Sequence, residues 1–294
     1  MRNVPGLEAV YQDYNSRGVS FHYIYKSLAH PGTNGYVRPL TLEERLKQIA
    51  AAKKQLGTRI PWVCDGMDNP LKHALGDAPN SIWVLDGKNR VVSRRWWCDP
   101  SALRRELAER VGPVAKPTSP SSIKYLSEVK PVKPAAVGVM PRLEVPGNMT
   151  PLKVTLLPSE KNAAPAYVKV RAELESKAMR DGKGRLYLGF FLDPLYHVHW
   201  NNLAEPLRFK ITATDGTRFS EREGEARRPK VDADADPREF LLNVADMRRR
   251  SSVELTVSYF ACNDDEGWCR PATQRYRITF EPDRDAGSRR RSRR

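Results

Sequence analysis

The chain has 294 residues, of which 40% are hydrophobic, and carries a formal net charge of +15 at pH 7. This length predicts two domains with room for a linker, and the hydrophobic share is sufficient for packed cores. The sequence has no run of about eighteen apolar residues, which excludes a membrane-spanning helix, and residues 1–14 lack the apolar segment of a signal peptide. Five of the positive charges lie in the terminal run 288–294, and no nucleic-acid-binding motif is present, so we expect no specific nucleic-acid partner.

Residues 1–113 carry alternating helix and strand signals. Thr41 and Glu44 form a capping box, Asp99 supplies a second N-cap, and the turn residues 86–89 predict a hairpin. The expected elements, in chain order, are a helix over 4–17, a strand over 19–25, a helix that begins at Thr41, a strand over 60–65, a short helix over 69–76, strands over 81–86 and 90–97, and a helix over 101–112. Helices between strands imply crossover connections, so this order predicts an α/β domain with a parallel sheet and an antiparallel hairpin at its edge.

The composition changes twice after this domain. Residues 114–148 are rich in proline, lysine and serine, which predicts an extended linker. Residues 149–284 then show strand-length apolar or alternating segments separated by turn signals, and helical periodicity appears only around 238–247. The segments are 152–158, 166–174, 185–192, 207–214, 252–261 and 273–281. They predict an all-β sandwich, followed by a disordered arginine-rich tail over 285–294.

The first domain resembles a known family. FHYIYKSLAHP, LTLEERLKQIAAAKKQ and IPWVCDGMDNPLKHALGDAPNSIWVLDGKNRVV are similar to the iodothyronine deiodinase-like branch of the thioredoxin fold, over roughly residues 4–112. The resemblance implies a thioredoxin-like domain, in which His30 takes the place of a histidine near the redox centre. It also puts Pro79 at the position of the fold's cis-proline. Leu28 stands where the family often has an acid.

The resemblance also implies what this chain lacks. In this fold the nucleophilic cysteine or selenocysteine follows the first strand, just before the first helix, whereas this chain begins almost at that helix. The missing strand would be central, so we expect its neighbours to expose unpaired N–H and C=O groups. We therefore expect a truncated start, with the nucleophile and an export signal encoded upstream. Cys64 is expected to be a buried core thiol and Cys98 lies just before the N-cap Asp99, and neither is expected to serve as a nucleophile.

The second domain resembles another family. DPLYHVHWNNLAEPLRF and YFACNDDEGWCRPATQRY are similar to the N-terminal periplasmic domain of the thiol:disulfide interchange protein DsbD, over roughly residues 150–282. The resemblance implies an immunoglobulin-like sandwich in which Cys262 and Cys269 exchange electrons with dithiol partners of the thioredoxin type. The histidines and tryptophan of the first motif are His197, His199 and Trp200. It also implies an extracytoplasmic, periplasmic location, although the absence of a visible signal peptide leaves a cytoplasmic one open.

The residues around the cysteine pair leave a structural staple and an exchange site both open. Six residues separate Cys262 and Cys269, which does not match the spacing of zinc ligands, so no metal or cofactor is expected. The intervening segment is polar and predicts an exposed loop, and exposed disulfides in short loops are the more easily reduced. Three acids in the loop are expected to raise the pKa of both thiols. Trp268 and Phe260 are expected to shield the sulfurs until a partner docks.

Two further expectations concern aromatic and histidine side chains. His197 and His199 are expected on one strand and therefore on one face of it. Trp83, Trp96 and Trp97 are expected to pack against the sheet of the first domain.

Together these patterns favour a thiol–disulfide redox protein, with Cys262, Cys269 and His30 as candidate catalytic residues. The alternatives are a binding or scaffold protein with a structural disulfide, and a deiodinase-like reductive dehalogenase whose nucleophile lies upstream. The tail 288–294 is a candidate contact for anionic surfaces.

Overall fold

The computed structural model describes residues 3–32, 36–78, 80–123, 137–158, 165–213 and 216–287. The chain divides into two compact units: unit 1 comprises Met1–Ser27 and Thr41–Pro131, and unit 2 comprises Leu28–Leu40 and Val132–Arg294. The expectations for Pro79 and for the tail 288–294 fall outside the described residues. Within those residues, no helix has the length and apolar character needed to cross a membrane.

Unit 1 contains the predicted helices and strands together with two short 3-10 helices, of which η2 lies in the predicted linker. They are α1 (Val4–Tyr14), η1 (Asn15–Arg17), β1 (Tyr23–Tyr25), α2 (Leu42–Leu56), β2 (Trp62–Cys64), α3 (Pro70–Leu75), β3 (Ile82–Leu85), β4 (Val91–Arg95), α4 (Pro100–Val111) and η2 (Pro120–Ser122). The side chain of Thr41 accepts a hydrogen bond from Glu44 N at 3.2 Å, and that of Asp99 accepts one from Ala102 N at 2.9 Å. The predicted caps are thus confirmed, because each side chain satisfies a backbone N–H that the first turn leaves unpaired.

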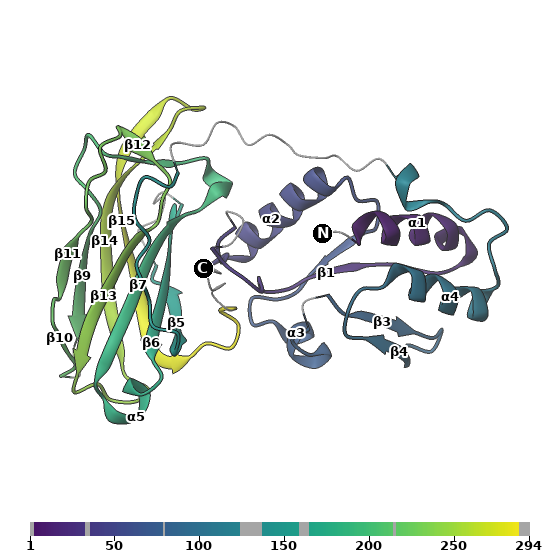
Figure 1. Cartoon of the computed structure of the whole chain (residues 1–294), viewed down its shortest axis with the longest axis horizontal. Helices are drawn as coiled ribbons and strands as arrows, with labels where there is room; N and C mark the ends of the chain where they lie inside the picture. Colours follow the sequence, from purple (N-terminus) through teal and green to yellow (C-terminus); the bar gives the residue numbers. More distant parts are fainter. Residues whose placement is uncertain are drawn as a thin grey trace. The chain divides into compact units, whose positions relative to one another are not determined.

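The strands of unit 1 do not form one sheet. Within the described residues, β1 pairs with β2 in parallel and β3 pairs with β4 antiparallel, as two separate two-stranded sheets (Figure 1). The expected continuous sheet is therefore wrong, because no described strand joins the two pairs.

The hairpin of β3 and β4 leaves large apolar side chains in solvent. Trp96 is 55% exposed and Trp97 is 62% exposed, so the expectation that they pack against the sheet is wrong. A small buried cluster of this unit lies between α1 and α4, where Val10 and Tyr14 meet Leu103 and Leu107.

Unit 2 is mostly β-structure. Its elements are β5 (Met149–Leu156), β6 (Val168–Glu175), α5 (Ala178–Asp181), β7 (Gly184–Leu192), η3 (Pro194–Tyr196), β8 (His199–Asn201), β9 (Arg208–Ala213), β10 (Arg218–Phe219), β11 (Glu223–Glu225), β12 (Ala233–Asp234), β13 (Arg238–Ala245), β14 (Ser252–Asn263) and β15 (Trp268–Pro282). The helical periodicity around 238–247 is misleading, because these residues form β13. Phe240, Leu242 and Val244 alternate along that strand, which pairs with β7 over seven residues, Arg238–Val244.

The strands of unit 2 form a curled sheet that folds back on itself. Its order is β10-β13-β7-β6-β5-β15-β14-β8-β12, with β9 on β14 and β11 on β9. The strand β5 belongs to both halves: Met149–Pro151 pair with β6, and Leu152–Leu156 pair with β15. Side chains from the two halves meet in one core, where Phe190 of β7 stacks on Phe209 of β9 with ring centroids 6.0 Å apart.

The described ends of the predicted linker are held by carboxylates. In unit 1, Asp13 accepts hydrogen bonds from the backbone N–H and the hydroxyl of Thr118. In unit 2, Asp236 accepts hydrogen bonds from the three consecutive backbone N–H groups of Gly138, Val139 and Met140, at 2.7–2.8 Å. The residues that flank 124–136 are therefore docked rather than fully extended.

Candidate functional site

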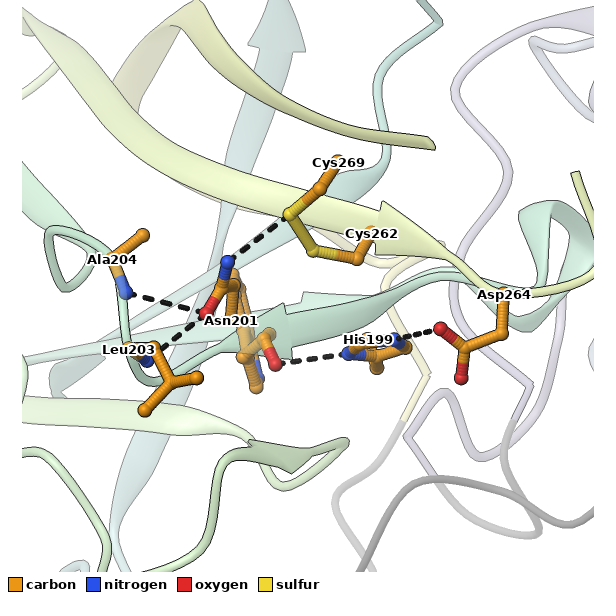
Figure 2. The surroundings of a disulfide bond; sticks show 8 residues. His199, Asn201, Leu203, Ala204, Cys262, Asp264 and Cys269 are labelled. Carbon is orange, nitrogen blue, oxygen red and sulfur yellow. Dashed lines mark hydrogen bonds and ion pairs between the residues drawn. A yellow bond between two sulfur atoms is a disulfide. The ribbon is translucent and has the colours of Figure 1, made fainter. Parts of the chain in front are cut away.

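Cys262 and Cys269 form a disulfide at the end of the hairpin made by β14 and β15 (Figure 2). The two residues lie directly opposite each other in the register, and Ala261 beside Cys262 points into the core. Because side chains alternate along a strand, the disulfide lies on the outer face of the sheet. The disulfide therefore takes no part in the packing of the core.

The two sulfur-bearing residues differ in exposure. Cys262 is buried, with 7% of its surface exposed, whereas Cys269 is exposed. Cys262 lies on β14, between β15 and β8, and is paired with a residue of each, Cys269 and His199. Cys269 lies on β15 at the rim of the hairpin. Cys269 is therefore the more accessible residue of the pair.

The loop acids have hydrogen-bonding partners. Asp264 lies 3.0 Å from His199 Nε2, and Asp265 lies 3.2 Å from His197 Nδ1. Glu266 accepts a hydrogen bond from the indole of Trp268. These contacts draw the carboxylates towards histidine and indole nitrogens rather than towards the sulfurs.

His197 and His199 contact neighbouring acids from different backbone conformations. His199 lies on β8, but His197 follows η3 with φ 52°, in the left-handed region, so the expectation that both lie on one strand is wrong. Asp193 and Pro194 begin η3 and set this turn, since Asp193 Oδ1 accepts from Leu195 N at 3.0 Å. The other ring nitrogen of His199, Nδ1, lies 3.0 Å from Trp200 O. Both nitrogens of His199 thus face oxygen acceptors, and a neutral imidazole donates to only one of them.

Trp268 does not shield the sulfurs. It is next to Cys269 on β15, so its side chain points to the opposite face of the sheet. There it packs against the core, with its ring centroid 5.5 Å from that of Tyr167, and the guanidinium of Arg270 lies 4.0 Å from its ring centroid. Phe260 is two residues before Cys262 and shares its face, where it is partly buried.

Trp200 fixes the strand β8 beside the disulfide. Its side chain is buried, and its indole nitrogen donates a hydrogen bond to Asp236 O at 2.7 Å. The guanidinium of Arg238 lies 5.1 Å from the centroid of its ring, and Tyr259 meets it edge to face. Trp200 is therefore an anchor in the core rather than a group at the sulfurs.

Asn201 contacts the disulfide directly, and sequence reasoning missed it. Its Nδ2 donates a hydrogen bond to Cys269 Sγ at 3.1 Å, while its Oδ1 accepts from Leu203 N and Ala204 N (Figure 2). The sequence offers one partial signal, because an asparagine after a strand is typical of a turn. The contact with sulfur depends on the pairing of β8 with β14, which no local pattern reveals.

The other sequence-predicted residues lie elsewhere. His30 is exposed, and its neighbours Pro31 and Gly32 line a small pocket with residues of β5, β6 and β7. Burial raises the pKa of the Cys64 thiol and of the Cys98 thiol. Hydrogen bonding from Asn3 opposes that rise at Cys98 without reversing it. Neither thiol is activated as a nucleophile, because a raised pKa leaves little thiolate at neutral pH.

Within the described ranges, no group of three or more histidine, cysteine or acidic side chains is arranged to hold a metal ion. Comparisons of the chain with protein-family models, with curated proteins and with solved structures find no match.

Proposed function

We propose that this chain is a thiol–disulfide exchange protein that passes electrons to or from dithiol partner proteins through Cys262 and Cys269. The observation that carries the proposal is the placement of the disulfide on the outer face of the hairpin, with Cys269 exposed and Cys262 buried. Exposed disulfides in short loops are the ones that partner thiols reduce readily.

A structural staple is supported less well by this placement. The hairpin is already paired along its length, from Ser252 opposite Thr279 to Asn263 opposite Trp268. Closing the short loop from Cys262 to Cys269 stabilises the fold by only about 2.5 kcal/mol in the chain-entropy model. Neither cysteine belongs to the hydrophobic core on the other face of the sheet.

The exchange reaction can be written with all bonds and charges balanced. A partner thiolate attacks Cys269 Sγ, a bond forms between the two sulfurs, and Cys262 leaves as a thiolate. The partner's second thiolate then attacks its own first sulfur, and Cys269 leaves as a thiolate. The partner dithiol is oxidised to a disulfide, and the pair gains two electrons. In the opposite direction, the Cys269 thiolate attacks a partner disulfide and Cys262 resolves the mixed disulfide.

The finer fold assignments belong to the same proposal. We take unit 1 to be thioredoxin-like and unit 2 to be an immunoglobulin-like sandwich of the DsbD type, in an extracytoplasmic setting where such exchange operates. The parallel pair, the hairpin and the four helices of unit 1 support the first assignment. The two facing halves of the curled sheet support the second. A dehalogenase reaction has less support, because its expected nucleophile lies upstream of this sequence and the two free thiols present, Cys64 and Cys98, both have a raised pKa.

The reduction potential of the pair tests the proposal. The protein is equilibrated across a glutathione series and quenched with acid, and the thiols are alkylated and quantified by peptide mass spectrometry. A Cys64→Ser/Cys98→Ser variant serves as the control in which only the pair titrates. A potential of roughly −120 to −270 mV supports exchange, and a value below about −300 mV identifies a staple and a scaffold role.

Trapping with thioredoxin tests which sulfur faces the partner. Cys262→Ser retains the exposed Cys269, and Cys269→Ser retains the buried Cys262. We expect the first variant to form at least about tenfold more mixed disulfide with an activated single-cysteine thioredoxin, because thiol exchange depends on access. Equal trapping by the two variants contradicts the assigned direction of attack.

A further inference from the structure

The carboxamide of Asn201 has one fixed orientation. Its Oδ1 accepts hydrogen bonds from Leu203 N at 2.9 Å and from Ala204 N at 3.2 Å. A backbone N–H can only donate, so the oxygen must face these two groups and the nitrogen must face away from them. Nδ2 therefore points at Cys269 Sγ, 3.1 Å away (Figure 2). The donor role of Asn201 follows from geometry and not from a choice between amide rotamers.

The backbone that carries Asn201 is held on both sides. On one side β8 pairs with β14, with Trp200 opposite Ala261 and His199 opposite Cys262. On the other side it pairs with β12, with Asn201 opposite Ala233. The donor is therefore held in place before any partner arrives, as an effective electrostatic contact requires.

Asn201 is the one side chain hydrogen-bonded to either sulfur, among the residues that the structure describes. The nearby charged groups make other contacts. Asp264 and Asp265 lie against His199 and His197, and Glu266 accepts from Trp268. The guanidinium of Arg270 stacks on the ring of Trp268.

We propose that Asn201 is a positioning residue that stabilises the thiolate of Cys269 in the reduced protein. The inference rests on the proposed exchange function, which it deepens by assigning the residue that selects between the two sulfurs. When the disulfide is reduced, the sulfur of Cys269 gains an electron pair and a negative charge. A hydrogen bond to a charged acceptor is stronger than one to a neutral acceptor, so the contact favours the thiolate over the thiol. Because it favours the reduced form, it also raises the reduction potential of the pair.

Asn201→Asp isolates the donor. The carboxylate keeps an oxygen for Leu203 N and Ala204 N, so the turn is retained, but the group that faces the sulfur can no longer donate. Asn201→Ala removes the donor without adding charge. Leu203→Asp is the matched charge control, because the Leu203 side chain is 73% exposed and its substitution adds a carboxylate two residues away while leaving the amide of Asn201 intact.

The readout is the rate at which iodoacetamide alkylates Cys269 in the fully reduced full-length protein, from pH 5 to pH 10. Peptide mass spectrometry separates Cys269 from the other three cysteines. We expect Asn201→Ala and Asn201→Asp to slow alkylation at pH 7 by about tenfold or more, and to move the midpoint of the pH profile upwards. Leu203→Asp should produce a smaller shift than Asn201→Asp. Circular dichroism checks that each variant is folded.

Two outcomes overturn the inference. One is an unchanged alkylation profile in folded Asn201→Asp. The other is an equal shift from Leu203→Asp, which would assign the effect to charge and not to the donor. Neither outcome depends on a partner protein. Failure of the exchange function shows instead as a potential below about −300 mV, which can occur with the alkylation shift intact.

Discussion

Unit 1 and unit 2 use similar strand-forming segments but differ in how completely those strands are paired. In unit 2 every long strand has neighbours in one curled sheet, and the alternating residues of β14 are buried on the core face. In unit 1 two isolated pairs leave Leu85, Val91 and Trp97 exposed on or beside a hairpin. A strand pattern in the sequence therefore specifies local conformation, whereas the burial of the side chains depends on the neighbouring strand.

The largest expected difference between the two units is in the stability lost when an apolar side chain is truncated. Phe190 in unit 2 is fully buried and contacts the rings of Phe209 and Phe240. We expect Phe190→Ala to lower the free energy of unfolding of unit 2 by about 4 kcal/mol, measured by urea unfolding with circular dichroism. Val91→Ala in unit 1 is the control and should cost less than about 1 kcal/mol, because Val91 is half exposed. Equal losses from the two substitutions would remove the distinction between the units.

A slightly smaller effect is expected from the buried ion pair of unit 2. Asp234 and Arg238 are both buried, and Arg238 Nη2 lies 2.6 Å from Asp234 Oδ2. Burial acts to raise the pKa of Asp234, but hydrogen bonds from Arg238 and Asn202 outweigh it and hold the pKa below its ordinary value. A lowered folded pKa stabilises the protein above about pH 4, and this contribution is lost as the pH falls through the folded pKa.

We therefore expect Asp234→Asn to cost about 3 kcal/mol at pH 7, since it leaves Arg238 buried without its charge partner. The wild-type and variant stabilities should converge as the pH falls below about 4 and through the folded pKa of Asp234, which urea titrations at each pH would measure. In unit 1, Asp13→Asn is the variant to compare with Asp234→Asn. The pKa of Asp13 is lowered in the same way, because hydrogen bonds from Thr118 and Arg104 outweigh the effect of its partial burial. If the difference in unfolding free energy between the wild type and Asp234→Asn stays constant with pH, the ion pair is not the cause of that difference.

The smallest effect is expected at the exposed hairpin of unit 1. Trp97→Ala should change the free energy of unfolding by less than about 0.5 kcal/mol, because the side chain is largely in solvent. Tyr14→Ala, in the buried core of the same unit, should cost several times more. Urea unfolding of both variants makes the comparison. A cost above about 2 kcal/mol for Trp97→Ala would mean that this tryptophan is covered in the folded protein.

Local signals in the sequence predicted the local structure well. The caps at Thr41 and Asp99 and the hairpin at 86–89 are present, because each depends on residues a few positions apart. The strand β13 was hidden by leucines and valines that also fit helical spacing. The strand conformation of β13 is set by its seven-residue pairing with β7, and that pairing joins segments about fifty residues apart.

The candidate site also has features that the sequence predicts and contacts that it does not reveal. The cysteine pair and its polar loop were visible in the sequence, and strand alternation could also have placed Trp268 on the face opposite Cys269. The contact of Asn201 with Cys269 joins two residues whose separation of 68 positions gives no periodic signal. The left-handed turn at His197 likewise depends on η3, which a strand pattern does not reveal.

The double pairing of β5 has a consequence for the order of folding. Met149–Pro151 can pair with β6 soon after synthesis, but Leu152–Leu156 must wait for β15, more than one hundred residues later in the chain. Pairing between such distant segments slows folding, because a long loop must close before the contacts form. Cys269 is the second residue of β15 and precedes Tyr276–Pro282, the part of this strand that pairs with β5. During translation, the disulfide with Cys262 can therefore form before the residues that close the sheet have been made.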